Sequence, residues 1–422
     1  MDENRKYRGY IKYLIPLYII YSFALYIFNV FYQNNIIPQA IIFNWKFYFL
    51  ILFALCAINI CINHSIDRFS FLFFVLISIF FITYSLEFII CGNVRLSFFQ
   101  NLSFYLVPTL SGLIISKNIP SKVLLNTNLY LAIIVSLIAI YQLIFDNTLF
   151  NAYPKNAGML DWEFWRMPST IGSPMMLGMY LGLSVSAYLL LMKGTNVIFI
   201  VILIIGGLIS GSKVFGAIFI LSSFAFLKVI LKPKYLIFLL IPIILGVIFI
   251  IPKLDNTLID TFKRAFFLQD NLMYTESTNR MVIYDKAFAD ISENLLGNDI
   301  SEYSMANRIS DKNDDNHYAV ESYQLTLLYD TGIIGSLVFN MMFLLFIIKN
   351  RGPHRLFSII FYFATFPVHS LFFSYFYVFW ALLFYDLRNT AVAPLPVQRY
   401  RYSVSDASRH LNISRINSKL CD

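Results

Sequence analysis

Long apolar runs alternate with short polar breaks along most of the chain. Leu96 to Ser116 and Val123 to Phe145 are continuous and uncharged, and a helix needs about 20 apolar residues to cross a bilayer. A transmembrane β-barrel would instead need short segments of alternating polarity. The pattern therefore predicts an all-α, polytopic integral membrane protein with about twelve transmembrane helices.

The predicted spans follow the uncharged runs, with Lys and Arg allowed at their ends. They are 11–31, 45–62, 70–90, 97–116, 123–145, 173–192, 195–211, 213–230, 235–252, 323–348, 356–369 and 371–387. The last two come from one run, Leu356 to Tyr385, which is too long for one span and contains Pro367 and His369. Whether this run makes one span or two stays open at this point.

Lys and Arg gather in alternate loops and in the C-terminal tail, which predicts that both termini are cytoplasmic. The predicted organisation is helices one to nine in 1–252, with a smaller outward loop at 146–172; a large outward loop at 253–322; helices ten to twelve in 323–387; and a disordered, basic cytoplasmic tail at 388–422. Apolar residues at helical spacing around 283–291 predict that the large loop is partly helical.

Composition supports this class: the 422 residues are 58% hydrophobic and only 13% charged. The net charge of +8 would suggest a nucleic-acid partner in a soluble protein, but here its position along the chain reports membrane topology, and no nucleic acid is expected. The four cysteines show neither a disulfide framework nor zinc-ligand spacing. The apolar run after the basic N-terminus is long for a signal peptide, so a retained first helix is expected.

Four polar clusters fall on the outward side of this topology, and each also has a structural explanation. They are Trp165 to Thr170 with Arg166, Ser210-Gly211-Ser212-Lys213, Thr278-Asn279-Arg280, and His317 to Ser322 with Glu321. Arg and Lys at a membrane boundary can bind phosphate oxygens. The structural explanations are an interfacial anchor for Arg166 and, favoured when each cluster is taken alone, a snorkelling side chain for Lys213 and a solvated surface position for Arg280. His317 and Glu321 are four residues apart, so they share a helix face, and either could act as a general base. A Glu at a helix start can equally well complement the helix dipole.

A calcium loop is not expected in the large outward loop. Asp311, Asn313 and Asp315 imitate its first ligands, but Asn316 stands where such a loop needs Gly, and Ser322 stands in place of the final Glu.

Taken together and in order, the four clusters and the following Gly332-Ile333-Ile334-Gly335 resemble the O-antigen polymerase and O-antigen ligase superfamily over residues 160–350. The ligases of that superfamily carry a His, then Asn, Ser or Gln, then nine residues, then Gly-x-x-Gly. In this chain Glu321 stands at the His position, Ser322 follows, and Tyr323 to Thr331 are the nine residues before Gly332. His317 lies four residues too early, so the resemblance favours a polymerase.

The resemblance implies a metal-independent, inverting glycosyltransferase without a cofactor, which lies in the bacterial inner membrane with its active site facing the periplasm. It would transfer a growing glycan from undecaprenyl pyrophosphate to the non-reducing end of a lipid-linked repeat unit. By this resemblance Arg166, Lys213 and Arg280 would bind the pyrophosphate, and Glu321, with His317 as the alternative, would be the base.

Two alternatives stay open. One is an O-antigen ligase that transfers glycan to lipid A-core, and the other, from a different class, is a lipid or polysaccharide transporter or flippase. A chain-length regulator protein is a candidate partner of a polymerase, beside the lipid-linked oligosaccharide and the bilayer.

Overall fold

The computed structural model describes residues 68–91, 96–145, 167, 169–171, 173–192, 196–230, 289, 322–366 and 374–385. All regular structure within these residues is helical. The predicted spans 11–31, 45–62 and 235–252, the C-terminal tail, and nearly all of the loops 146–172 and 253–322 lie outside the described residues.

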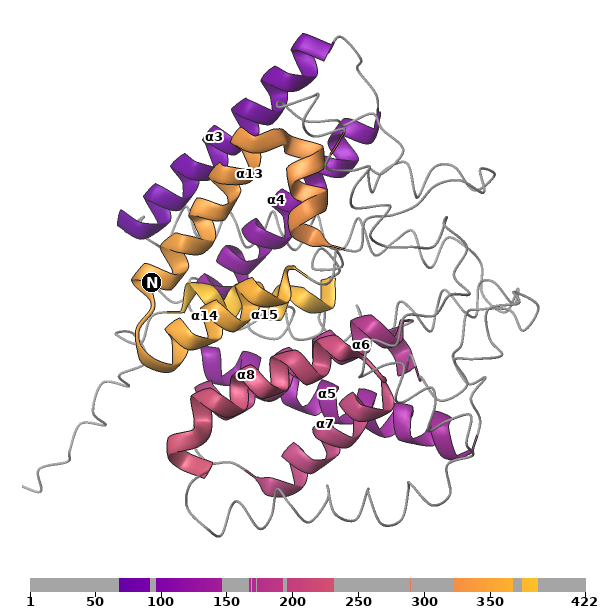
Figure 1. Cartoon of the computed structure of the whole chain (residues 1–422). Helices are drawn as coiled ribbons and strands as arrows, with labels where there is room; N and C mark the ends of the chain where they lie inside the picture. Colours follow the sequence, from indigo (N-terminus) through magenta and orange to yellow (C-terminus); the bar gives the residue numbers. More distant parts are fainter. Residues whose placement is uncertain are drawn as a thin grey trace, which may run out of the picture. The chain divides into compact units, whose positions relative to one another are not determined.

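The described helices coincide with the apolar runs of the sequence (Figure 1). They are α3 (Arg68–Cys91), α4 (Leu96–Asn118), α5 (Ser121–Ile144), α6 (Pro174–Leu191), α7 (Val197–Ile209), α8 (Lys213–Ile230), α13 (Tyr323–Lys349), α14 (Gly352–Ala364) and α15 (Tyr377–Phe384). Short 3₁₀ turns, η1 (Ser169–Ile171) and η6 (Ser374–Phe376), precede α6 and α15. At the majority of helix ends, the boundary predicted from hydropathy therefore lies within a few residues of the observed one.

Three of the described helices are long and apolar enough to cross a membrane: Ser121–Ile144, Pro174–Leu191 and Tyr323–Lys349. The segments Phe69–Ser85, Val197–Ile209 and Lys213–Ser223 form shorter apolar helices. The chain is thus a helical protein of the membrane type.

The run from Leu356 to Tyr385 contains two helices. The first, α14, starts before the predicted boundary, at Gly352, because Pro353 suits a first helical turn. It ends at Ala364, two residues before Phe366, whose conformation the following Pro367 restricts. After η6, α15 begins at Tyr377.

Contacts between helix ends sort those ends into two groups. At one end, here called the Lys349 end, the Lys349 ammonium donates to the carbonyl oxygen of Phe384 at 3.3 Å. The hydroxyl of Tyr385 donates to the carbonyl oxygen of Ile119 there at 2.6 Å.

At the other end, here called the Ser322 end, the amide of Gln324 donates to Thr365 Oγ1 at 2.8 Å. The hydroxyl of Tyr375 lies 3.2 Å from Met176 Sδ at the same end. These contacts join helix ends that would share one side if successive helices cross in alternating directions.

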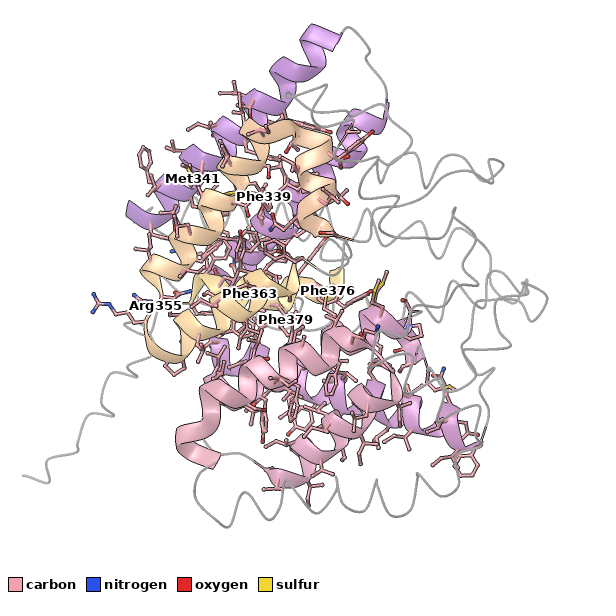
Figure 2. The ribbon with its side chains drawn as sticks, in the orientation of Figure 1. Phe339, Met341, Arg355, Phe363, Phe376 and Phe379 are labelled. Carbon is pink, nitrogen blue, oxygen red and sulfur yellow. The ribbon has the colours of Figure 1, made fainter. Side chains whose placement is uncertain are left out.

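Aromatic rings fill the space between α3, α4, α13 and α15. Phe339, labelled on α13 in Figure 2, lies 5.3 Å from Phe80 and 6.4 Å from Trp380 between ring centroids. Phe379 of α15, also labelled there, lies 5.6 Å from Tyr180 of α6. Aromatic pairs of this kind contribute about 0.5–1.5 kcal/mol each. They therefore stabilise the packing of the helices whose ends form the Ser322 end.

Candidate functional site

The segment Ser210-Gly211-Ser212-Lys213 forms a tight turn between α7 and α8. Gly211 has a φ of 57°, a left-handed conformation that glycine adopts without steric cost. The hydroxyl of Ser210 donates to the carbonyl oxygen of Gly207 at 2.6 Å and accepts from the amide of Ser212 at 3.3 Å. The turn is therefore held by its own side chains, and α8 starts directly at Lys213.

This turn packs against two other segments of the Ser322 end. The main-chain amide of Met167 donates to the carbonyl oxygen of Ile209, the last residue of α7, at 3.3 Å. Gly178 of α6 lies beneath the turn, where a methyl group would be only 2.7 Å from Ser210 Oγ. Met167 belongs to the first polar cluster of the sequence, so this cluster contacts α7 directly before the second cluster begins.

The 3₁₀ turn that follows Met167 has a strained backbone. Ser169 has a φ of 52°, which few residues other than glycine adopt. Its amide donates to Gln142 Oε1 at 2.8 Å, and its hydroxyl donates to the carbonyl oxygen of Val135 at 2.7 Å. Strain that is held by specific bonds occurs preferentially at functional sites, which makes this segment a candidate part of one.

Lys213 is exposed at the N-terminus of α8. Next to it, the hydroxyl of Ser212 is buried and has no hydrogen-bond partner among the described residues. A helix N-terminus carries unsatisfied N–H groups and a partial positive charge, so it favours anions. The turn therefore places an exposed ammonium group at a helix N-terminus, an arrangement that suits a phosphate group.

The start of α13 belongs to the same end of the helices. Ser322 is its N-cap, with its side chain accepting a hydrogen bond from the amide of Leu325 at 3.3 Å. Gln324 joins this start to Thr365 at the C-terminus of α14. Glu321 directly precedes Ser322 in the sequence.

Helix α13 is broken at Gly332, which the sequence analysis did not predict. Gly332 has φ 63° and ψ −174°, a combination that only glycine adopts readily. Figure 1 shows the resulting corner between two helical arms, Tyr323 to Thr331 and Ile333 to Lys349. The first glycine of the Gly-x-x-Gly motif is therefore the point at which the helix changes direction.

An acidic residue that the sequence analysis overlooked lies in the first of these arms. Asp330 is fully buried, and its Oδ2 accepts a hydrogen bond of 2.7 Å from the hydroxyl of Tyr105 in α4. An Asp at the centre of a membrane helix costs about 2.5–3.5 kcal/mol on insertion scales, so such residues usually have a function. The signal was present in the sequence as an acid within an apolar run.

Four of the five predicted site residues, Arg166, Arg280, His317 and Glu321, lie outside the described residues. Their proposed roles stay predictions, and Lys213 is the predicted site residue that the structure describes. What the structure brings together is Met167, which follows Arg166 in the sequence, and Ile209, which is four residues before Lys213. Among the described residues no group of three or more His, Cys, Asp or Glu side chains could hold a metal ion.

The chain was compared with protein-family models and with curated protein sequences, and neither comparison gives a match.

Proposed function

We propose that the protein is a polysaccharide polymerase of the O-antigen or capsule type. In this proposal it transfers a growing glycan from undecaprenyl pyrophosphate to the non-reducing end of a lipid-linked repeat unit. The reaction takes place at the periplasmic face of the bacterial inner membrane, which the chain crosses several times with both termini in the cytoplasm. The Ser322 end of the helices then faces the periplasm.

The observation that carries the proposal is the bond between Met167 and Ile209. In this hydrogen bond the main-chain amide of Met167, the residue after Arg166, donates to the carbonyl oxygen of Ile209, the residue before the turn that carries Lys213, at 3.3 Å. Lys213 stands at the N-terminus of α8. The bond supports the proposal that Arg166 and Lys213 act on one pyrophosphate, whose negative charge increases as it leaves.

The proposed reaction is a single displacement. The oxygen of an acceptor hydroxyl forms a bond to the anomeric carbon of the donor, and the bond from that carbon to the pyrophosphate oxygen breaks with its electron pair. Glu321, with His317 as the alternative, takes the hydroxyl proton, and Arg166, Lys213 and Arg280 stabilise the departing pyrophosphate. Attack opposite to the leaving group inverts the configuration of the anomeric carbon.

The test uses the purified full chain in lipid nanodiscs with the lipid-linked repeat unit as its sole substrate. A polymerase produces a ladder of longer lipid-linked glycans, whereas a ligase without lipid A-core produces none. Arg166→Ala, Arg280→Ala and Glu321→Gln should each abolish the ladder. If all three variants still extend the glycan at the normal rate, the proposed site is wrong.

A transporter or flippase is the second candidate, and the broken helix α13 favours it. Transporters often have interrupted helices with buried ionisable residues near their substrate sites, and Asp330 lies two residues before the break at Gly332. The two functions differ in a measurable way. A flippase moves a fluorescent lipid-linked oligosaccharide across a proteoliposome membrane without lengthening it, and a polymerase lengthens it without moving it.

A further inference from the structure

The two glycines of the Gly-x-x-Gly motif have different structural tasks. Gly332 supplies the backbone conformation of the corner in α13. Gly335 leaves room for Thr331, because a methyl group on Gly335 would lie 2.7 Å from Thr331 Cβ. The hydroxyl of Thr331 donates to the carbonyl oxygen of Leu327 at 2.7 Å and so closes the last turn of the first arm. The motif thus builds the corner that sets the direction of the first arm.

One residue of α4 contacts the first arm at two places. The hydroxyl of Tyr105 donates to Asp330 Oδ2 at 2.7 Å, near the corner. The ring of Tyr105 also lies 5.6 Å from the ring of Tyr323, at the start of the arm. Tyr323 and Asp330 are seven residues apart, so they lie on the same face of the helix, two turns from each other.

In the sequence, the arm that Tyr105 holds begins two residues after the predicted base. Ser322 caps this arm, and Glu321 is the residue before it. Because a helical arm is stiff, a rotation about Gly332 would move its far end by several ångströms. The hydrogen bond of Asp330 near the corner and that of Gln324 to Thr365 at the start of the arm therefore hold the direction of the arm together.

We infer that Tyr105 and Asp330 are positioning residues, whose hydrogen bond helps to fix the first arm of α13 and so orients its start at Ser322, the residue that follows the proposed base Glu321 in the sequence. The inference rests on the proposed function in that it uses Glu321 as the base. Its structural half, the anchoring of the arm by this bond, does not depend on any reaction.

Hydrogen exchange measures the anchoring, with the full chain in nanodiscs and the peptide that covers residues 323–331. Tyr105→Phe and Asp330→Leu should each speed exchange of these amides at least tenfold. Asp330→Asn should leave it unchanged, because its amide oxygen still accepts from Tyr105. The control is Tyr130→Phe, which removes the hydroxyl of an exposed tyrosine on α5. Unchanged exchange in Tyr105→Phe would overturn the inference whatever the protein catalyses.

Kinetics measure the consequence of the anchoring. Tyr105→Phe should lower kcat at least tenfold and leave KM for the lipid-linked repeat within twofold, with Asp330→Asn close to normal. The double variant Tyr105→Phe with Asp330→Leu should be no slower than the slower single variant, because both remove the same bond. A normal kcat in Tyr105→Phe, or an Asp330→Asn variant as slow as Asp330→Leu, would overturn positioning by this bond. If the unaltered chain makes no ladder, the proposed function fails, and the exchange experiment still decides the anchoring.

Discussion

Gly178 of α6 lies directly against Ser212, so closely that a methyl group on Gly178 would be 2.7 Å from Ser212 Oγ. One helical turn further on, a methyl group on Gly182 would lie 3.2 Å from the Cβ of Ile218 in α8. Glycines four residues apart let two membrane helices approach closely. The pair Gly178 and Gly182 therefore allows the short distance between α6 and α8. Gly178 also lets the Ser210–Lys213 turn pack directly on α6.

The first prediction concerns this contact. Gly178→Ala should displace the turn and lower both stability and chain extension, because the added methyl group overlaps two serine side chains. Overpacking of this kind costs about 1–3 kcal/mol, which exceeds the gain of about 1 kcal/mol from the better helix propensity of alanine. Thermal unfolding in nanodiscs and the product ladder are the measurements.

Gly216→Ala is the matched control for Gly178→Ala. It adds the same methyl group to α8, at a position where nothing lies within 4 Å, so it should be as stable as the unaltered chain or slightly more stable. If Gly178→Ala behaves like Gly216→Ala, the turn does not depend on the close contact.

The second prediction concerns Lys213. Because its side chain is exposed, Lys213→Gln should change the free energy of unfolding by less than about 0.5 kcal/mol. Loss of one group that stabilises the developing charge typically lowers kcat by about 10²–10³-fold, and a decrease of this order is expected. Lys213→Arg should retain most of the activity, since a cation stays in place.

The control for charge at the opposite end is Lys122→Gln. Lys122 is also exposed, but it lies at the start of α5, away from the Ser322 end. Equal losses of kcat in Lys122→Gln and Lys213→Gln would mean that overall charge matters and not the turn.

The sequence predicted the described helices well because their signal is local. Most of them are apolar runs bounded by charged residues, Gly or Pro, and the bilayer requires such runs to be helical. The contact of Met167 with Ile209 could not be derived in this way, because it depends on how α6 and α7 pack. The charge pattern predicts both clusters on one side of the membrane but gives no distance between them.

The break at Gly332 was missed for a related reason. Hydropathy does not register backbone conformation, so the residues 323–348 read as one apolar helix. A hydropathy profile does not depend on φ, so it does not reveal a glycine with a positive φ. The Gly-x-x-Gly spacing does include the residue at which the helix breaks. Asp330 does not stand out in the sequence because it is a single acid in an otherwise apolar run. In the structure it is fully buried and accepts a hydrogen bond from Tyr105, which makes it a candidate functional residue.

The third prediction tests the corner itself. Gly332→Ala should destabilise the protein, since the conformation at φ 63° and ψ −174° costs an alanine about 1–3 kcal/mol. The alternative for the chain is to straighten α13, which would displace the start of this helix at Ser322. In either case the rate of chain extension per folded molecule should fall, in addition to the loss of stability. A Gly332→Ala variant with a normal melting temperature and a normal ladder would show that the corner is not required.

The fourth prediction concerns the Lys349 end, which lies away from the proposed site. Asn350 is buried, and its Nδ2 donates to the carbonyl oxygen of Leu383 at 3.0 Å and to Ser358 Oγ at 2.8 Å. The last carbonyl groups of α15 have no partner within their own helix, so Asn350, together with Lys349, caps that helix from outside.

Asn350→Leu keeps a side chain of similar size but removes both donated hydrogen bonds. A buried carbonyl left without its donor costs about 1–3 kcal/mol, so the melting temperature should fall, while kcat per folded molecule stays normal. Arg351→Gln is the control, because Arg351 is exposed and makes no side-chain capping bond to α14. A loss of kcat in Asn350→Leu at unchanged stability would contradict the assignment of chemistry to the Ser322 end, since this substitution acts only on the opposite end of the helices.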